Sequence, residues 1–488
     1  MNVFKFAIDK YKSLSVVAKA AFWFTVCSFL QQGISMIVTP FLTRMLTSEE
    51  YGIWSVYQTW LTIISIFSTL NLAGGGIINA IIKFKPDQNK LISSLLVLGL
   101  ATTIAFGSIY LIAEPILKNL INLKKEYVFL MLGEIYFRFV FSLWATQNRY
   151  NYKYRSIVLV TFLSSLVSQL ASLLMVYYSS NKLEMRIYSS ALVPSAVYCV
   201  LLIIMLIKGK CFFCFSFWKY MLLFNIPLIP HYLSQIVLNQ SDRIMIERIC
   251  GNSFVAFYSV SYTIGFVITI LLNSILSAVS PWLMDKYSQK DHSKIDVVIN
   301  SLAIFFAVTI LLPIALGPEL ISILGPDEYQ QAKWVVIPVA SSVYFVFLYN
   351  IFSSYLFFLE KKMFIAISSI IAAGANVLLN YLFLPIYGFV AAGYTTLVCY
   401  ILYSFAVFIF LSIMCKRTNA KRLFNYSFLF VVGIIVVTFS LLCNALYLDD
   451  YMRYRFIMVI IVILLTLTPK LLLVFKGVKG GLKNETKL

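Results

Sequence analysis

The sequence predicts an all-α polytopic membrane protein of about fourteen transmembrane helices, with two six-helix lobes and a C-terminal helix pair. Its composition, its long apolar segments and the placement of its basic residues support this. Of 488 residues, 61% are hydrophobic and 12% are charged, and the mean hydropathy is +0.87. Soluble domains are about one quarter charged. A soluble chain this apolar could not cover its surface with polar groups.

Fourteen apolar segments are long enough to cross a bilayer, since roughly 20 residues of helix span a hydrocarbon core of about 30 Å. Helix is expected because each segment must satisfy its own backbone hydrogen bonds in lipid. The predicted spans are 16–42, 52–82, 91–113, 127–147, 156–178, 187–207, 220–240, 254–284, 297–324, 334–359, 363–384, 388–414, 424–447 and 455–475.

Basic residues between the spans predict that both termini are cytoplasmic. With that orientation, 27 of the 39 lysines and arginines fall in cytoplasmic segments. Cytoplasmic loops carry an excess of lysine and arginine, and a miscounted helix would have inverted half of the pattern. The lysines before the first span do not precede a signal-type cleavage site, so we expect the first helix to be retained. The predicted location is the bacterial inner membrane.

A faint internal repeat at an offset near 200 residues predicts two parallel halves. Arg155 with Gln169 fourteen residues on mirrors Lys362 with Asn376, and Arg44 at the end of the first span mirrors Arg243 at the end of the seventh. The predicted organisation is an N-terminal lobe (1–207), a basic cytoplasmic linker (208–219), a C-terminal lobe (220–414), and a terminal helix pair with a basic tail (415–488).

Several other classes of protein find no support in the sequence. The net charge of +19 comes from short basic clusters between apolar runs rather than from one face, so we expect no nucleic-acid partner. Cys211 and Cys214 form a CxxC pair, but no second pair or nearby histidine completes a zinc site. No nucleotide-binding, metal or nucleophile motif is present, so we expect neither a cofactor nor an enzyme.

A charged residue inside a membrane span is unfavourable. Inserting an arginine at mid-bilayer costs about 2.5–3.5 kcal/mol on insertion scales, so each such residue is expected to have a structural or functional role. Glu134 and Arg138 lie four residues apart in the fourth span, so they share a helix face and can pair. Two interpretations stay open: a cationic contact for an anionic substrate, or a structural ion pair between helices.

The seventh span is the most polar helix, with His231 inside it and Asp242 and Arg243 at its outer end. His231 could accept a coupling proton, or it could pack beside Pro227 and Pro230, which should kink the helix. Asn376 and Asn380, one turn apart, are the better substrate-facing candidates among the amides, although helix–helix hydrogen bonding is an alternative.

Six segments, in order and spacing, resemble the Wzx-type polysaccharide-unit flippases of the multidrug/oligosaccharidyl-lipid/polysaccharide exporter superfamily. They are Thr43–Gly52, Pro227–Ser234, Asp242–Ile246, Phe257–Gly265, Leu324–Tyr329 and Pro385–Gly393. The resemblance implies two six-helix lobes around a central cationic cavity, with Arg44, Arg138 and Arg243 as contacts. It also implies the substrate, an undecaprenyl-pyrophosphate-linked oligosaccharide moved from the inner to the outer leaflet for O-antigen or a similar polymer. The other implied partners are membrane lipid and the polysaccharide polymerase.

Other functions compete with this one. A drug or cation antiporter of the same superfamily would favour an acidic cavity, for which Glu134 and Asp242 are the available groups. A lipid II flippase would share the fourteen helices. A surface-polysaccharide polymerase or ligase is disfavoured, because such enzymes usually carry a large extracytoplasmic loop and no loop here is long enough.

Overall fold

The described part of the chain is helical, with α-helices, three short 3-10 helices and no strand. The computed structural model describes residues 16–74, 76–289, 291, 293–417, 423–447, 453–458 and 460. The chain divides into two compact units, Met1–Val237 (unit 1) and Leu238–Leu488 (unit 2). The boundary falls within one helix, beyond the basic linker 208–219. The lobe limits drawn from the sequence therefore stay a prediction.

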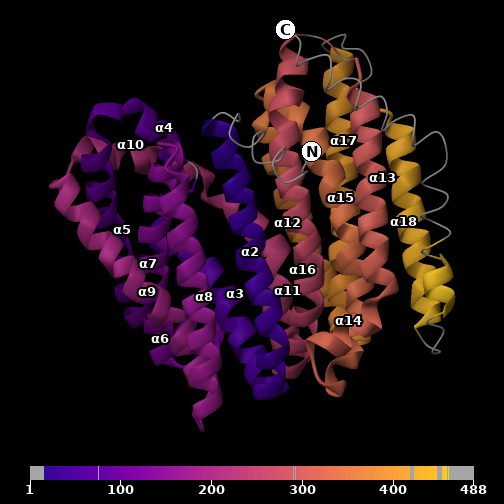
Figure 1. Ribbon diagram of the computed structural model, residues 1–488, viewed down its shortest axis with the longest axis horizontal. Helices are drawn as coiled ribbons and strands as arrows, with labels where there is room; N and C mark the ends of the chain where they lie inside the picture. Colours follow the sequence, from indigo (N-terminus) through magenta and orange to yellow (C-terminus); the bar gives the residue numbers. More distant parts are fainter. Residues whose placement is uncertain are drawn as a thin grey trace, which may run out of the picture. The chain divides into compact units, whose positions relative to one another are not determined.

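Unit 1 is a bundle in which α8 packs against α2 and α9, and α9 also packs against α5 and α7 (Figure 1). Its helices are α2 (Val16–Met45), α3 (Ser48–Thr69), α4 (Ile77–Lys83), η1 (Lys85–Asp87), α5 (Gln88–Ile112), α6 (Glu114–Ile121), α7 (Lys125–Tyr150), α8 (Tyr154–Tyr178), α9 (Lys182–Gly209), α10 (Phe215–Asn225), η2 (Ile226–Leu228) and the start of α11 (Ile229–Ile249).

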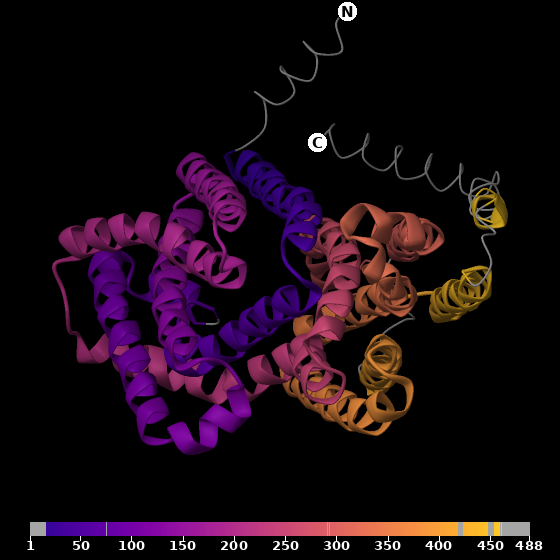
Figure 2. The same ribbon diagram turned by 90° about the horizontal axis from the view of Figure 1, so that it is seen from below.

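Unit 2 is organised around α15, which packs against α12, α13, α17 and α18. Its helices, after the rest of α11, are α12 (Asn252–Ser288), α13 (Ile295–Ala315), α14 (Gly317–Leu324), η3 (Asp327–Ala332), α15 (Lys333–Phe358), α16 (Lys362–Tyr387), α17 (Val390–Arg417) and α18 (Tyr426–Leu446). Seen from below, several long helices within a unit run obliquely to one another (Figure 2).

Twelve of the described helical segments are long and apolar enough to cross a membrane. Large apolar side chains are exposed along them, including Ile104, Leu159, Ile371 and Ile434. Exposed apolar surface on this scale marks contact with lipid or a partner, not with water. The chain is therefore a multi-pass membrane protein, as predicted. The count of fourteen is not confirmed, and most of the predicted span 455–475 lies outside the described residues.

The predicted second span is broken in the structure. It forms α3 and the short α4, separated by a turn in which Leu70 and Asn71 have positive φ. The run of glycines at 74–76 predicts an interruption of this span, and in the structure the interruption begins earlier, at Leu70. α3 is not among the twelve spanning segments, and its polar residues Ser55, Thr59 and Ser68 are buried.

The seventh span changes from α-helix to 3-10 helix at the place where Pro227 and Pro230 predict a kink. The 3-10 helix η2 contains Pro227 and joins α10 to α11. One expectation is corrected: Asp242 and Arg243 do not end this helix but lie about two turns before its last residue, Ile249. The apolar residues that follow Arg243 continue the helix, so the two charged residues belong to its interior.

The internal repeat is visible in local backbone structure. Tyr152 and Glu360, 208 residues apart, both have positive φ (56° and 59°) and precede α8 and α16. Lys153 N donates to Asn148 O, and Lys361 N donates to Leu356 O, each at 2.9 Å. The short α6 and α14 are both eight residues long with a proline in the first turn. Matching turns at matching offsets support two parallel repeats.

Two native cysteines allow the predicted orientation to be tested. Cys214 precedes α10 and Cys250 follows α11, so the predicted topology places them on opposite sides of the membrane. The Ser216 hydroxyl, 3.2 Å from the Cys214 sulfur, lowers the pKa of that thiol, whereas burial raises the pKa of Cys250. Because the thiolate is the reactive form, Cys214 should react faster at neutral pH.

We expect a membrane-impermeant maleimide to label a variant that retains only Cys250 in right-side-out spheroplasts. A variant that retains only Cys214 should be labelled only in inverted vesicles. The reverse pattern would place both termini outside.

Candidate functional site

Glu134 is the centre of a polar cluster inside unit 1, which we call the Glu134 cluster: Tyr57, Glu134, Arg138 and Arg186. The Arg138 Nη2 atom lies 2.5 Å from Glu134 Oε1, and Tyr57 Oη donates to Glu134 Oε2 at 2.8 Å. The predicted pairing of Glu134 with Arg138 is confirmed. Both carboxylate oxygens therefore have a donor although the side chain is only 2% exposed, as a buried acid requires.

Arg138 differs from its partner in exposure. Its side chain is 48% exposed, although α7 is a spanning segment. Its Nη2 atom also reaches Gln58 Oε1 at 3.4 Å. A guanidinium at this depth faces a polar path or a partner rather than hydrocarbon.

Arg186 belongs to this cluster because its guanidinium interacts electrostatically with the Glu134 carboxylate. The sequence does not predict it, because its position favours a loop just before a span. It lies in the second turn of α9 and is 4% exposed. Its Nη1 atom donates to Ser172 Oγ at 2.6 Å, and its guanidinium lies 4.3 Å from the Trp54 ring centroid. Its Nε atom is buried without a hydrogen-bond acceptor among the described residues. The only sequence signal for a helix near Arg186 is the apolar stretch that follows it. That stretch predicts a span from residue 187, five residues after α9 begins at Lys182.

Asp242 is the centre of a second cluster, inside unit 2. This Asp242 cluster comprises Asp242, Tyr258, Asn376, Asn380 and Thr396. Asp242 is 0% exposed. Its Oδ2 atom accepts from Tyr258 Oη at 2.5 Å and from Thr396 Oγ1 at 2.9 Å, and its Oδ1 atom accepts from Asn380 Nδ2 at 2.6 Å. Three helices, α12, α16 and α17, thus supply donors to one carboxylate on α11.

The two asparagines extend the Asp242 cluster between α16 and α17. Asn376 Nδ2 donates to Thr396 Oγ1 at 3.2 Å, and Asn380 Oδ1 accepts from Thr395 Oγ1 at 2.5 Å. Both asparagines are completely buried. Both asparagines form hydrogen bonds between helices, which the sequence allows as the alternative to a substrate contact. The bond from Asn380 to Asn376 also holds in place the Asn380 amide that donates to Asp242.

Arg243 lies beside the Asp242 cluster and is half-buried. Its Nη1 atom donates to Gln240 Oε1 at 3.0 Å, and its guanidinium lies 4.6 Å from the Tyr262 ring centroid. Cation–π contacts of this kind hold a guanidinium in a fixed direction.

The two units hold their acids in a related way. Tyr57 on α3 and Tyr258 on α12 are 201 residues apart, close to the offset of the repeat, and each donates its hydroxyl to a buried carboxylate. The acids come from different helices, α7 and α11. The two tyrosines therefore occupy equivalent positions in the two repeats, whereas the two acids do not.

Two sequence-predicted residues lie elsewhere. Arg44 is exposed in the last turn of α2, where its Nη1 atom donates to the Pro40 carbonyl at 2.9 Å. His231 is half-buried in the first turn of α11, where its carbonyl accepts from Ser234 Oγ. It lies in unit 1, whereas Asp242 lies in unit 2. The structure thus brings together Glu134 with Arg138, and Asp242 with Asn376 and Asn380.

Parts of the sequence motifs have structural roles. Thr47 and Glu50 form the capping box that begins α3, each side chain bonded to the other residue's backbone N–H. Tyr329 is fully buried, with its ring centroid 5.0 Å from that of Phe257. These segments are explained by helix capping and packing.

The fold is similar to the folds of two solved membrane proteins. It is similar to an inward closed conformation of the lipid II flippase MurJ, with a TM-score of 0.66, 14% identity, and coverage of 91% of this chain and 97% of that one. It is also similar to an inward-facing multidrug resistance transporter of the MATE family, with a TM-score of 0.61, 11% identity, and coverage of 80% and 95%.

The chain belongs to the polysaccharide biosynthesis protein family, whose match covers residues 17–286, more than half of the sequence. A second match, to the MatE family, covers residues 227–382. Protein 1 of the Lsg locus of Haemophilus influenzae is 24% identical over 380 residues, which cover 71% of this chain and 87% of that protein.

Proposed function

We propose that the protein is a flippase that moves an undecaprenyl-pyrophosphate-linked oligosaccharide unit from the inner to the outer leaflet of the bacterial inner membrane. Membership of the polysaccharide biosynthesis protein family supports this substrate class. The observation that carries the proposal is Arg138, a half-exposed guanidinium within a spanning helix. An arginine in this position provides an electrostatic partner for the pyrophosphate as it leaves the cytoplasmic leaflet.

The charges of the Glu134 cluster favour an anionic over a cationic substrate. Two arginines accompany one glutamate, and the glutamate is buried and doubly hydrogen-bonded. The accessible charge in this part of unit 1 is therefore positive.

The membrane potential would assist the movement. With the cell interior negative, outward movement of an anion gains about 2.3 kcal/mol per charge for each 100 mV. The arginines of the Glu134 cluster then need only lower the free-energy cost of bringing the charged headgroup into the membrane. The polyprenyl tail stays in lipid throughout.

A cation or drug antiporter is the second candidate function, favoured by the fully buried Asp242. A carboxylate held by Tyr258, Asn380 and Thr396 could exchange a proton or sodium ion. The same group, with Glu134 or His231, would serve as a coupling site if the flippase is driven by a cation gradient.

A deletion strain distinguishes the two functions. We expect it to lose long-chain surface polysaccharide on a gel and to accumulate repeat units on undecaprenyl pyrophosphate at the cytoplasmic face. Expression of the wild-type chain should restore both. Unchanged polysaccharide with altered sensitivity to cationic drugs would instead support the antiporter.

A further inference from the structure

A large polar cavity lies within unit 1, at the end where α4 and α10 are found (Figure 1). The ends of three helices form it: the start of α5, the end of α7 and the end of α9. Its volume is about 960 Å³, at the upper end of the usual range for ligand sites. The predicted topology places this end in the cytoplasm. We call this cavity the lysine pocket.

Five lysines line the lysine pocket against a single carboxylate, that of Asp87. Lys90 pairs with Asp87 at 2.9 Å. The other four, Lys85, Lys153, Lys208 and Lys210, form no ion pair with a carboxylate in the described part of the chain. The pocket therefore carries an excess of uncompensated positive charge, which favours a phosphate-bearing ligand.

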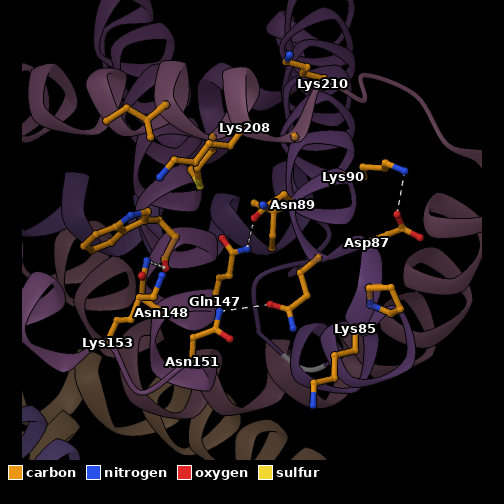
Figure 3. A pocket seen from close by; sticks show the side chains of 17 residues that line it. Lys85, Asp87, Asn89, Lys90, Gln147, Asn148, Asn151, Lys153, Lys208 and Lys210 are labelled. Carbon is orange, nitrogen blue, oxygen red and sulfur yellow. Dashed lines mark hydrogen bonds and ion pairs between the residues drawn. The ribbon is translucent and has the colours of Figure 1, made fainter.

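Amide side chains occupy the centre of the pocket. Gln147 Nε2 donates to Asn89 Oδ1 at 2.9 Å, and Asn151 Nδ2 donates to Gln88 Oε1 at 3.3 Å (Figure 3). These two bonds tie the end of α7 to the start of α5. Each amide uses one donor or acceptor in its bond and retains others, so the group presents several directed donors and acceptors to a ligand.

Amides and an aromatic ring are a combination suited to sugars. Trp144 lines the same cavity, one turn before Asn148. An indole ring offers an apolar face for a pyranose ring, and amides bond its hydroxyls. A phospholipid headgroup would need the lysines but would leave most of the amides unused.

A glycine at the end of α9, Gly209, allows α9 to approach the start of α5 closely. A Cβ atom on residue 209 would clash with the Asn89 carbonyl oxygen and with Ser93 Oγ, so Gly209 is required there. Ser93 Oγ also donates to the Cys211 carbonyl at 2.8 Å. Gly209 thus lets the chain that carries Lys208 and Lys210 rest against the amide-bearing start of α5.

We propose that the lysine pocket is a cytoplasmic binding site for a phosphate-linked saccharide headgroup. The lysines would bind the phosphates, and the amides with Trp144 would bind the sugar. The choice of ligand rests on the proposed function, whereas the location of the site rests on the residues that line the pocket.

The test is a binding titration of the full chain in phosphatidylcholine nanodiscs by thermophoresis. The probes are inorganic pyrophosphate and N-acetylglucosamine linked through diphosphate to a short prenyl chain. We expect the saccharide probe to bind at least about tenfold more tightly than pyrophosphate, because it adds hydrogen bonds that pyrophosphate lacks.

Two double variants separate the two parts of the site. Lys153→Gln with Lys208→Gln should weaken both probes by at least about tenfold, since charge-assisted bonds are lost. Asn89→Ala with Gln147→Ala should lower the affinity for the saccharide probe to that for pyrophosphate and leave the affinity for pyrophosphate unchanged. The matched control, Lys219→Gln with Lys361→Gln, removes the same charge from exposed lysines outside the pocket and should bind as wild type. An unchanged melting temperature shows that each variant is folded.

Several results would overturn the proposal. Unchanged binding by both pocket variants would place the ligand elsewhere. Equal affinity for the two probes, with full competition by phosphatidylglycerol in the nanodisc, would make the pocket a phospholipid site. The binding titration requires no translocation, and both pocket variants retain Arg138, so failure of this site remains distinguishable from failure of the proposed transport, which the deletion strain tests.

Discussion

The Arg138→Ala protein is expected to reach the membrane in normal amount and to lose oligosaccharide translocation. Arg138 is the half-exposed cation of the Glu134 cluster, and its removal leaves no other exposed positive charge among the four residues of that cluster. A charge-assisted hydrogen bond is worth about 1.5–3 kcal/mol. Its loss in the transition state alone would slow translocation roughly 10- to 100-fold. The measurement is long-chain polysaccharide in a deletion strain that expresses the variant.

Charge-preserving and partner variants show whether Arg138 acts on the substrate or only braces Glu134. Arg138→Lys should restore part of the activity, because it keeps the charge and loses the planar fork. Glu134→Gln should stay active if Glu134 only orients Arg138, since Tyr57 can still donate to the amide oxygen. Full translocation by Arg138→Ala would remove this residue from the mechanism.

The second large effect is expected in stability, from Asp242→Ala. This change leaves the donors of Tyr258, Asn380 and Thr396 buried without their acceptor. Each unsatisfied buried donor costs about 1–3 kcal/mol. We therefore expect a loss of at least about 3 kcal/mol, seen as a clear fall in the melting temperature of the purified protein in detergent.

Asp242→Asn and Asp291→Ala are the matched variants for that measurement. Asp242→Asn keeps an acceptor oxygen, so it should lose less stability and reveal whether the negative charge itself is needed for transport. Asp291, which pairs with Lys286 and lies outside the helices, is only partly buried, and its removal should leave the melting temperature unchanged. A melting temperature for Asp242→Ala equal to that of wild type would contradict the geometry of the Asp242 cluster.

The sequence predicts features that depend on residues close together in the chain. The Glu134–Arg138 pair follows from a spacing of four residues on one helix, and the 3-10 segment at Pro227 follows from the missing backbone N–H. The kind of fold followed from composition and from segment length. The repeat was detectable because matching residues recur at a nearly constant offset.

What it could not predict required contacts between distant segments. Asp242 and Asn380 are 138 residues apart, and nothing in either segment specifies their contact. The position of Arg186 favours a loop because polar residues precede it and apolar ones follow. The basic clusters near residues 85, 153 and 208 are each visible in the sequence, but only the packing of α5, α7 and α9 brings them around one set of amides.

Translocation by purified protein tests the central claim most directly. The chain would be reconstituted into proteoliposomes that contain undecaprenyl-pyrophosphate-linked oligosaccharide with a fluorophore on the sugar, and a membrane-impermeant quencher would then be added. We predict that the protein makes nearly all of the fluorophore accessible to the quencher. On the same time scale the Arg138→Ala protein should leave the fluorophore of the inner leaflet protected, because the quencher cannot cross the membrane. An equal protected fraction with wild-type protein, variant protein and no protein would contradict the proposal that this chain is a flippase.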